Sequence, residues 1–107
     1  MKFEMKRKID ELGRIVLPID MRTYYEIASG DSVVLLPVRE GIQIAKADLF
    51  ILNHLPNDLV VTVDELGRIV IPATIRKQFD FEAKDTMCIL PNETCMLMYK
   101  EKALKEV

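Results

Sequence analysis

The most constraining feature of the sequence is a nine-residue segment that occurs twice. Residues 10–18 read DELGRIVLP and residues 64–72 read DELGRIVIP. Shifting the chain by 54 positions places residues 7–46 over residues 61–100 without a gap, and most apolar positions stay apolar. Two copies are too few for a solenoid, which needs about three or more repeats to bury its faces. We therefore expect a closed pseudo-dimer, in which each copy covers the apolar face of the other.

Each copy predicts the same order of elements, β-β-α-β-β. A first strand ends near Ile9 or Val63, and the turn D-E-L-G leads into a second strand, RIVLP or RIVIP. The consecutive apolar residues of this second strand predict burial on both of its faces. A proline then starts a short helix, expected over residues 19–26 and 73–80, and a polar turn leads into a β-hairpin. The chain is therefore expected to be mostly β with short helices.

The two copies also define the expected domain organisation. Residues 1–46 form the first repeat, and residues 59–107 form the second repeat with a short charged tail. About 40 residues of this kind have little core of their own, so the two repeats are expected to form one folded unit. Residues 47–58 match neither repeat and are expected to form a short linker helix packed on the body. The alternative is a helix that binds a partner or joins copies of the chain.

Composition narrows the class of protein. The chain has 107 residues, half of them apolar, and a formal net charge of -2. It is therefore expected to be globular, and its overall charge gives no indication of nucleic-acid binding. The basic start MKFEMKRK is not followed by an apolar run of signal-peptide length, and no apolar stretch is long enough to span a bilayer. We expect a cytoplasmic protein of bacterial type, in which Cys88 and Cys95 are reduced thiols.

The duplicated motif carries a family resemblance. KIDELGRIVLPIDMR and VTVDELGRIVIPATIRK both resemble the N-terminal DNA-binding domain of the AbrB, SpoVT and MazE group of transcription factors, and the resemblance covers about 80 of the 107 residues. In that family, two chains of a β-β-α-β-β unit interleave as a swapped-hairpin barrel that binds DNA. The resemblance implies that this chain forms the AbrB-type barrel alone, as an intrachain pseudo-dimer. It also implies a transcriptional regulator whose partner is double-stranded DNA.

The resemblance further implies a set of DNA-contacting residues, which in the family come from the first strand, the LGR turn and the start of the helix. By position, the basic residues here are Arg7, Lys8, Arg14, Arg22, Arg68, Arg76 and Lys77. Arginine suits this role because its planar fork makes paired hydrogen bonds to phosphate or to a guanine edge. The alternative for Arg14 and Arg68 is a local ion pair of little value with the acidic turn residues, which are Asp10, Glu11, Asp64 and Glu65.

The two copies are not electrostatic equals. Arg7 and Lys8 of the first copy align with Val61 and Thr62 of the second. We therefore expect the first copy to supply more of the attraction to DNA. A symmetric dimer tends towards a palindromic operator, whereas this chain is expected to prefer a non-palindromic site.

Other functions find less support in the sequence. The single histidine, His54, lies in the linker, and the cysteines form neither a CxxC motif nor a Cys/His set, so no catalytic site, metal or cofactor is expected. The glycines form no phosphate loop, and no small-molecule ligand is indicated. One alternative is a MazE-like antitoxin that binds DNA and a toxin; because only seven residues follow Lys100, the linker would have to contact the toxin. The other is a protein-interaction module without DNA binding.

Overall fold

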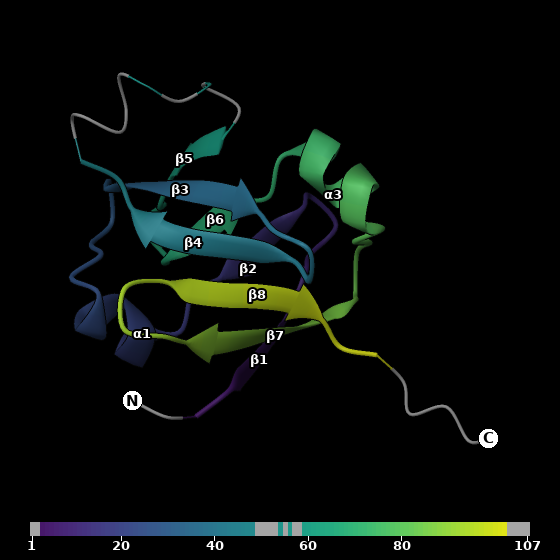
Figure 1. Cartoon of the computed structure of the whole chain (residues 1–107), viewed down its shortest axis with the longest axis horizontal. Helices are drawn as coiled ribbons and strands as arrows, with labels where there is room; N and C mark the ends of the chain where they lie inside the picture. Colours follow the sequence, from purple (N-terminus) through teal and green to yellow (C-terminus); the bar gives the residue numbers. More distant parts are fainter. Residues whose placement is uncertain (1–2, 49–53, 55, 57–58, 103–107) are drawn as a thin grey trace.

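The computed structural model describes residues 3–48, 54, 56 and 59–102 (Figure 1). The first half of the chain contains β1 (Met5–Lys8), β2 (Arg14–Val16), the helix α1 (Ile19–Tyr24), β3 (Ser32–Pro37) and β4 (Ile42–Lys46). The second half contains β5 (Val60–Thr62), β6 (Arg68–Val70), the helix α3 (Ala73–Phe79), β7 (Thr86–Pro91) and β8 (Met96–Lys100). The prediction of a mostly β chain with short helices is confirmed. The linker helix predicted for residues 47–58 falls largely outside the described residues.

Most strand pairs join the two halves of the chain. An open antiparallel sheet has the order β1-β7-β8-β4-β3-β5, and β2 pairs with β6 in a separate two-stranded ribbon. Among the pairs formed by the described residues, only the hairpins β3–β4 and β7–β8 stay within one half, whereas β1–β7, β3–β5, β4–β8 and β2–β6 cross between halves. Neither half therefore builds the large sheet without the other.

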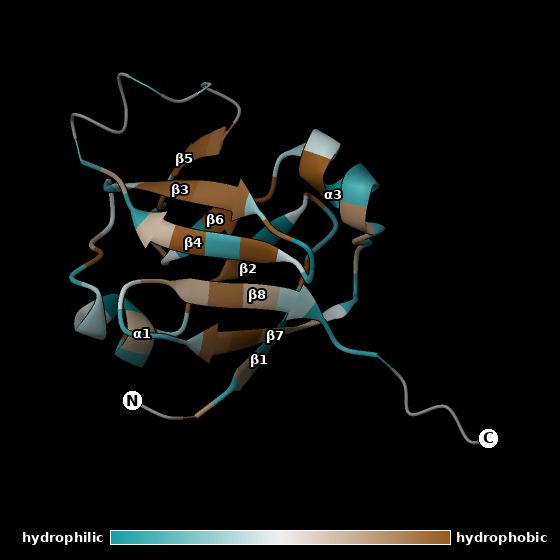
Figure 2. Ribbon diagram, in the orientation of Figure 1, coloured by the Kyte–Doolittle hydropathy of each residue, from teal (hydrophilic) through white to brown (hydrophobic). Residues whose placement is uncertain are grey.

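The core lies between the large sheet and the ribbon, which is seen behind β3, β4 and β8 in Figure 1. Figure 2 shows the hydrophobic residues concentrated on the strands, as the sequence pattern predicts. The largest fully buried side chains come from both halves and are Ile9, Ile15, Leu17, Met21, Leu35, Ile42, Ile44, Ile69, Ile71, Met87, Ile89 and Met96. Burial of aliphatic side chains on this scale is the main stabilising contribution to such a fold.

The ribbon corrects one prediction from the sequence. Ile15 and Ile69 face each other in register and are each 1% exposed. Their neighbours Val16 and Val70 are 37% and 47% exposed, so the expectation of burial on both faces is wrong. The ribbon packs on the core with one face only, and its strands alternate between buried and exposed positions. Consecutive apolar residues therefore misled the interpretation, because two of the valines lie on the outer face.

Candidate nucleic-acid interface

The D-E-L-G turns that precede the two ribbon strands have the same geometry. Asp10 Oδ1 accepts hydrogen bonds from the backbone N–H groups of Leu12 at 2.9 Å and Arg14 at 2.8 Å. Asp64 Oδ1 accepts the same two bonds in the second half, again at 2.9 and 2.8 Å. An aspartate that bonds to the backbone a few residues ahead of it stabilises a turn. Asp10 and Asp64 therefore shape their turns.

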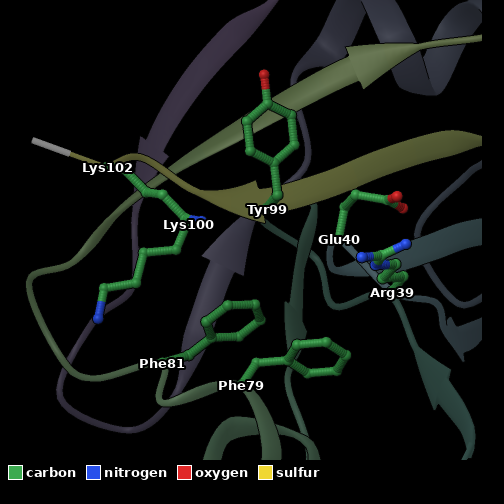
Figure 3. A pocket seen from close by; sticks show the side chains of 7 residues that line it. All are labelled: Arg39, Glu40, Phe79, Phe81, Tyr99, Lys100 and Lys102. Atoms are coloured by element: carbon green, nitrogen blue, oxygen red, sulfur yellow. The ribbon is translucent and has the colours of Figure 1, made fainter. Parts of the chain in front are cut away.

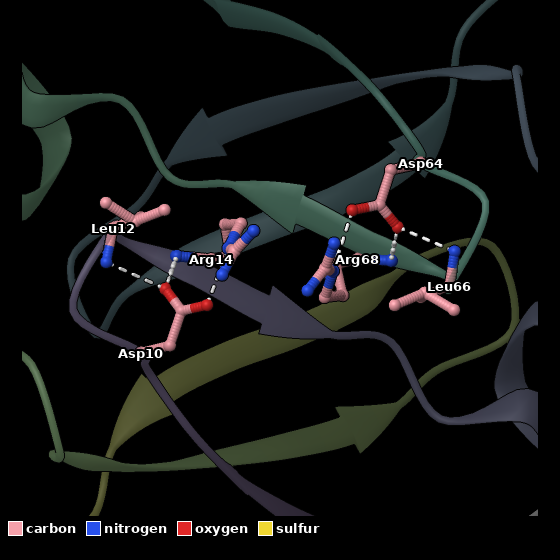
Figure 4. Close-up of polar contacts among 6 residues, drawn as sticks. All are labelled: Asp10, Leu12, Arg14, Asp64, Leu66 and Arg68. Atoms are coloured by element: carbon pink, nitrogen blue, oxygen red, sulfur yellow. Dashed lines mark hydrogen bonds and ion pairs between the residues drawn. The ribbon is translucent and has the colours of Figure 1, made fainter.

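The ribbon places Arg14 and Arg68 on one face. Arg14 lies opposite Val70, and Val16 lies opposite Arg68, so these four side chains share the outer side of the ribbon. Each arginine also forms an ion pair with the aspartate of its own turn, with Nε–Oδ2 distances of 2.6 Å to Asp10 and 2.7 Å from Arg68 to Asp64 (Figure 4). The local ion pair, the alternative considered for these arginines, is therefore present in both halves.

These contacts shift the titration of the two aspartates. Loss of hydration raises the pKa of Asp10, but hydrogen bonds from the backbone and side chain of Arg14 and from the Leu12 N–H outweigh it, and the pKa lies below its usual value. For Asp64, the hydrogen bond from the Arg68 N–H is the largest cause and also lowers the pKa. Both carboxyl groups are therefore ionised at neutral pH.

Arg22 and Arg76 connect each helix to the turn of the other half. Arg22 Nε donates to the carbonyl of Leu17, and Arg76 Nε donates to that of Ile71, both at 2.9 Å. A Cβ atom built on Gly67 would lie 2.4 Å from Cζ of Arg22, and one built on Gly13 would lie 2.7 Å from Cζ of Arg76. Both glycines also have φ near +80°, at 79° and 78°.

This reciprocal packing of arginine on glycine was not predicted from the sequence. The available signal was that glycine and arginine are retained together in both copies, Gly13 with Arg22 and Gly67 with Arg76. Because each arginine contacts the turn of the opposite half, the pairing becomes visible only in the folded chain. It brings a second pair of guanidinium groups to the two ends of the ribbon.

The four arginines share one feature of their hydrogen bonding. Each uses Nε to hold a carboxylate or a backbone carbonyl, as the bonds of Arg14, Arg22, Arg68 and Arg76 show. Within the described part of the chain, their terminal nitrogens make no hydrogen bond. The Nε hydrogen bond therefore orients each of the four guanidinium groups.

The other predicted contact residues lie outside the two ribbon strands, on β1 and α3. Arg7, opposite Met87 on the core-facing side of β1, is half-buried and donates to the carbonyl of Lys6 at 2.7 Å. Lys8 is exposed on the same edge strand, and Lys77 is exposed on α3. β1 leads directly into the first D-E-L-G turn, so Arg7 and Lys8 flank one end of the ribbon.

The outer face of the ribbon also carries exposed apolar side chains. Leu12 and Leu66 are 63% and 66% exposed at the tips of the two turns, and Ile19 at the start of α1 is 66% exposed. Val16 and Val70 place further apolar surface beside Arg14 and Arg68 on the outer face of the ribbon. Exposed apolar groups that cluster in this way are typical of contact surfaces.

The cysteines lie outside the ribbon and its turns. Cys88 is buried and Cys95 is half-buried, and both are free thiols; burial raises the pKa of Cys88. Among the described residues, no group of three or more His, Cys, Asp or Glu side chains is placed to hold a metal ion. No helix in the described ranges is long and apolar enough to cross a membrane.

Comparison with known proteins gives a fold relationship. No family model matches the chain, and no curated protein matches it. The chain is similar to the solution structure of PHS018 from Pyrococcus horikoshii, with 19% identity, a TM-score of 0.51, and coverage of 94% of this chain and 95% of that chain. At this identity the likeness concerns the fold alone.

Proposed function

We propose that the chain is a double-stranded DNA-binding protein, a transcriptional regulator of the AbrB type, and that the ribbon is its contact surface. The observation that carries the proposal is the set of four arginines held by Nε around a two-stranded antiparallel ribbon. A two-stranded ribbon fits the major groove, and an arginine fork matches phosphate or the O6 and N7 atoms of guanine. Side chains fixed in advance lose less entropy on binding.

The proposal includes the swapped-hairpin barrel formed within one chain. Its support is the pairing of strands between halves, above all β2 with β6 and β1 with β7. In a chain that carries both halves, the two contact sets are covalently joined and can differ. Arg7 and Lys8 occur in the first half only, so the preferred DNA site is expected to be non-palindromic.

The charge around the ribbon sets the expected strength of binding. The four arginines are matched by four carboxylates of the turns, which are Asp10, Glu11, Asp64 and Glu65. The four arginines, two on the ribbon and two on the helices, and the four carboxylates are therefore neutral in sum. Arg7 and Lys8 of β1 and Lys77 of α3 add positive charge. Because electrostatic attraction to DNA follows the local patch, we expect weak binding to random DNA and tighter binding to a preferred sequence.

A salt titration tests the proposal. The full chain is titrated into a random-sequence duplex by fluorescence anisotropy at two salt concentrations, beside the double variant Arg14→Ala with Arg68→Ala. Each lost phosphate contact should reduce the slope of log K against log salt by about 0.9. Arg39→Ala, which removes an exposed cation from the β3–β4 turn, is the matched control and should bind like the parent. If the double variant and this control bind DNA equally well, the ribbon is not the contact surface.

The exposed apolar residues of the ribbon favour a second candidate, a protein-interaction module. Leu12 and Leu66 project at the turn tips, where a DNA backbone offers them little. If the chain does not bind a random-sequence duplex even at low salt, this second candidate is supported. A MazE-like toxin partner was expected to contact the linker, and that expectation falls on residues outside the described ranges.

A further inference from the structure

A cavity of about 480 Å³ lies where the β3–β4 turn meets the ends of α3 and β8 (Figure 3). It belongs to neither the ribbon nor the turns that precede it. The residues that line it are Arg39, Glu40, Phe79, Phe81, Tyr99, Lys100 and Lys102. Its volume falls within the range of about 300 to 1,000 Å³ that is typical of small-molecule sites.

At the related place in the other half of the molecule, a tyrosine hydroxyl bonds the hairpin turn. Tyr25, at the end of α1, donates from its hydroxyl to the carbonyl of Cys95 at 3.0 Å and also to that of Asn92. These acceptors belong to the β7–β8 turn, so Tyr25 ties the helix end to the hairpin. Phe79 occupies the position equivalent to Tyr25 under the 54-residue shift. Without a hydroxyl, it cannot make this bond to the β3–β4 turn.

The cavity has a flat apolar wall that the other half lacks. The rings of Phe79 and Phe81 are stacked, with centroids 5.3 Å apart and an interplanar angle of 18°. Figure 3 shows them side by side below β8, whereas the ring of Tyr99 points away from them. The Tyr99 hydroxyl donates to Glu4, which raises the pKa of Tyr99 to about 12. The residue equivalent to Phe81 is Ile27.

The cavity also differs in charge from the corresponding place near Tyr25. Lys100 is held by Asp85, with an Nζ–Oδ2 distance of 3.1 Å, and by the carbonyl of Asp80 at 2.9 Å. The remaining charged groups of the cavity are two cations, Arg39 and Lys102, and one carboxylate, Glu40. Under the 54-residue shift, Arg39 corresponds to the acid Glu93 and Glu40 to the neutral Thr94. The cavity therefore favours an anion more than the corresponding place in the other half does.

We propose that this cavity binds a small molecule that combines a flat aromatic ring with an anionic group. The ring packs against the Phe79–Phe81 wall, where aromatic pairs gain from offset or edge-on contact. The anionic group approaches Arg39 and Lys102, whose charged N–H donors make the stronger class of hydrogen bond. This site is independent of the DNA proposal, since it shares no residue with the ribbon.

The first test uses 2-naphthoate as the probe. The full ¹⁵N-labelled chain is titrated and followed by amide chemical shifts. Shifts are expected at Arg39, Glu40, Phe79 and Phe81 and not around Tyr25. Two matched probes, neutral 2-naphthylmethanol and non-aromatic cyclohexanecarboxylate, should each bind at least about tenfold more weakly, because each lacks one of the two recognised groups. Shifts spread over the whole surface, or equal affinity for all three probes, would overturn the proposal.

The second test uses the difference between the halves. Phe79→Tyr supplies the missing hydroxyl, and we expect it to bond the β3–β4 turn and reduce naphthoate affinity at least about tenfold. Arg39→Glu should reduce affinity similarly without altering the wall. The control, Tyr25→Phe, removes the hydroxyl from the acidic half and should leave naphthoate binding unchanged. The proposal fails if Phe79→Tyr and Arg39→Glu, both folded by their amide spectra, bind naphthoate as the parent does.

Discussion

The two D-E-L-G turns are nearly superimposable in their contacts, whereas the two helix ends have diverged. In each turn the same aspartate holds the same two backbone N–H groups, and the same glycine lies against an arginine of the other half. At the helix ends, Tyr25 bonds a hairpin turn and Phe79 does not. Residues stay identical where the backbone conformation and a contact between halves both depend on them. They differ at the helix ends, where the side chain makes a hydrogen bond in one half only.

The largest expected effect on stability comes from a substitution at Gly41, a turn residue that differs between the two halves. A Cβ atom on Gly41 would lie 2.1 Å from the backbone carbonyl oxygen of Met98, while the equivalent position in the second half already carries a side chain, Cys95. Gly41→Ala should therefore lower the free energy of unfolding by about 3 kcal/mol, the upper end of overpacking costs. Cys95→Ala is the matched variant and should cost about 1 kcal/mol or less. Urea denaturation measures both; equal costs would mean that the two turns are alike after all.

The next effect tests the reciprocal packing of arginine on glycine. Gly67→Ala places a Cβ in left-handed backbone and against the Arg22 guanidinium, and should cost about 2 kcal/mol. Gly30 also has positive φ, but nothing lies within 4 Å of its Cβ position, so Gly30→Ala should show the backbone cost alone, about 1 kcal/mol. Adding Arg22→Ala to Gly67→Ala should recover part of the difference, measured as a coupling free energy. If Gly67→Ala cost no more than Gly30→Ala, the arginine contact would be unimportant.

A smaller effect on stability is expected from the loss of the Tyr25 hydroxyl. Tyr25→Phe removes the hydrogen bonds to the β7–β8 turn and should lower the free energy of unfolding by about 1 kcal/mol. Tyr24→Phe removes a neighbouring hydroxyl from a side chain that is 51% exposed, and it should change stability by less than about 0.5 kcal/mol. Thermal unfolding of the two variants beside the parent distinguishes them. Identical melting temperatures would show that the Tyr25 bond adds nothing to stability.

The smallest effect concerns pH and should be the same in both turns. The folded-state pKa values of Asp10 and Asp64 lie below their ordinary value of about 3.9. Their contribution to stability is therefore complete above that value and is lost as pH falls through the folded-state pKa. Asp10→Asn and Asp64→Asn should each flatten the acid limb of a stability–pH curve below about pH 4, and Glu11→Gln serves as the control. Different slopes for the two asparagine variants would break the equivalence of the turns.

Much of the fold followed from the sequence, because the repeat fixed the order and spacing of the elements. The helices end a residue or two before the expected positions, at Tyr24 and Phe79. Burial of the ribbon strands was predicted wrongly, since a run of apolar residues does not distinguish a strand covered on both sides from one with exposed valines. The linker expectation falls largely on residues outside the described ranges.

The candidate site was less predictable than the fold. The sequence named the arginines but did not show what each one contacts, because Arg22 and Arg76 reach the opposite half of the chain. Tyr25 packs against the core, and the acceptors of its hydroxyl lie on a hairpin turn far along the sequence. Contacts of this kind depend on how the halves meet, and a pattern within one half carries no information about that.

The pairing of β1 has a consequence for how the chain folds as it is made. Met5 lies beside Ile89 in the finished sheet, so the first strand has no partner until nearly all the described residues have left the ribosome. Contacts between residues so distant in sequence close long loops and slow the folding reaction. Until then the nascent chain exposes unpaired strand edges and apolar side chains, the features that make partly folded chains prone to aggregate. A fold whose strands pair across two halves therefore leaves β1 unprotected until β7 has been made.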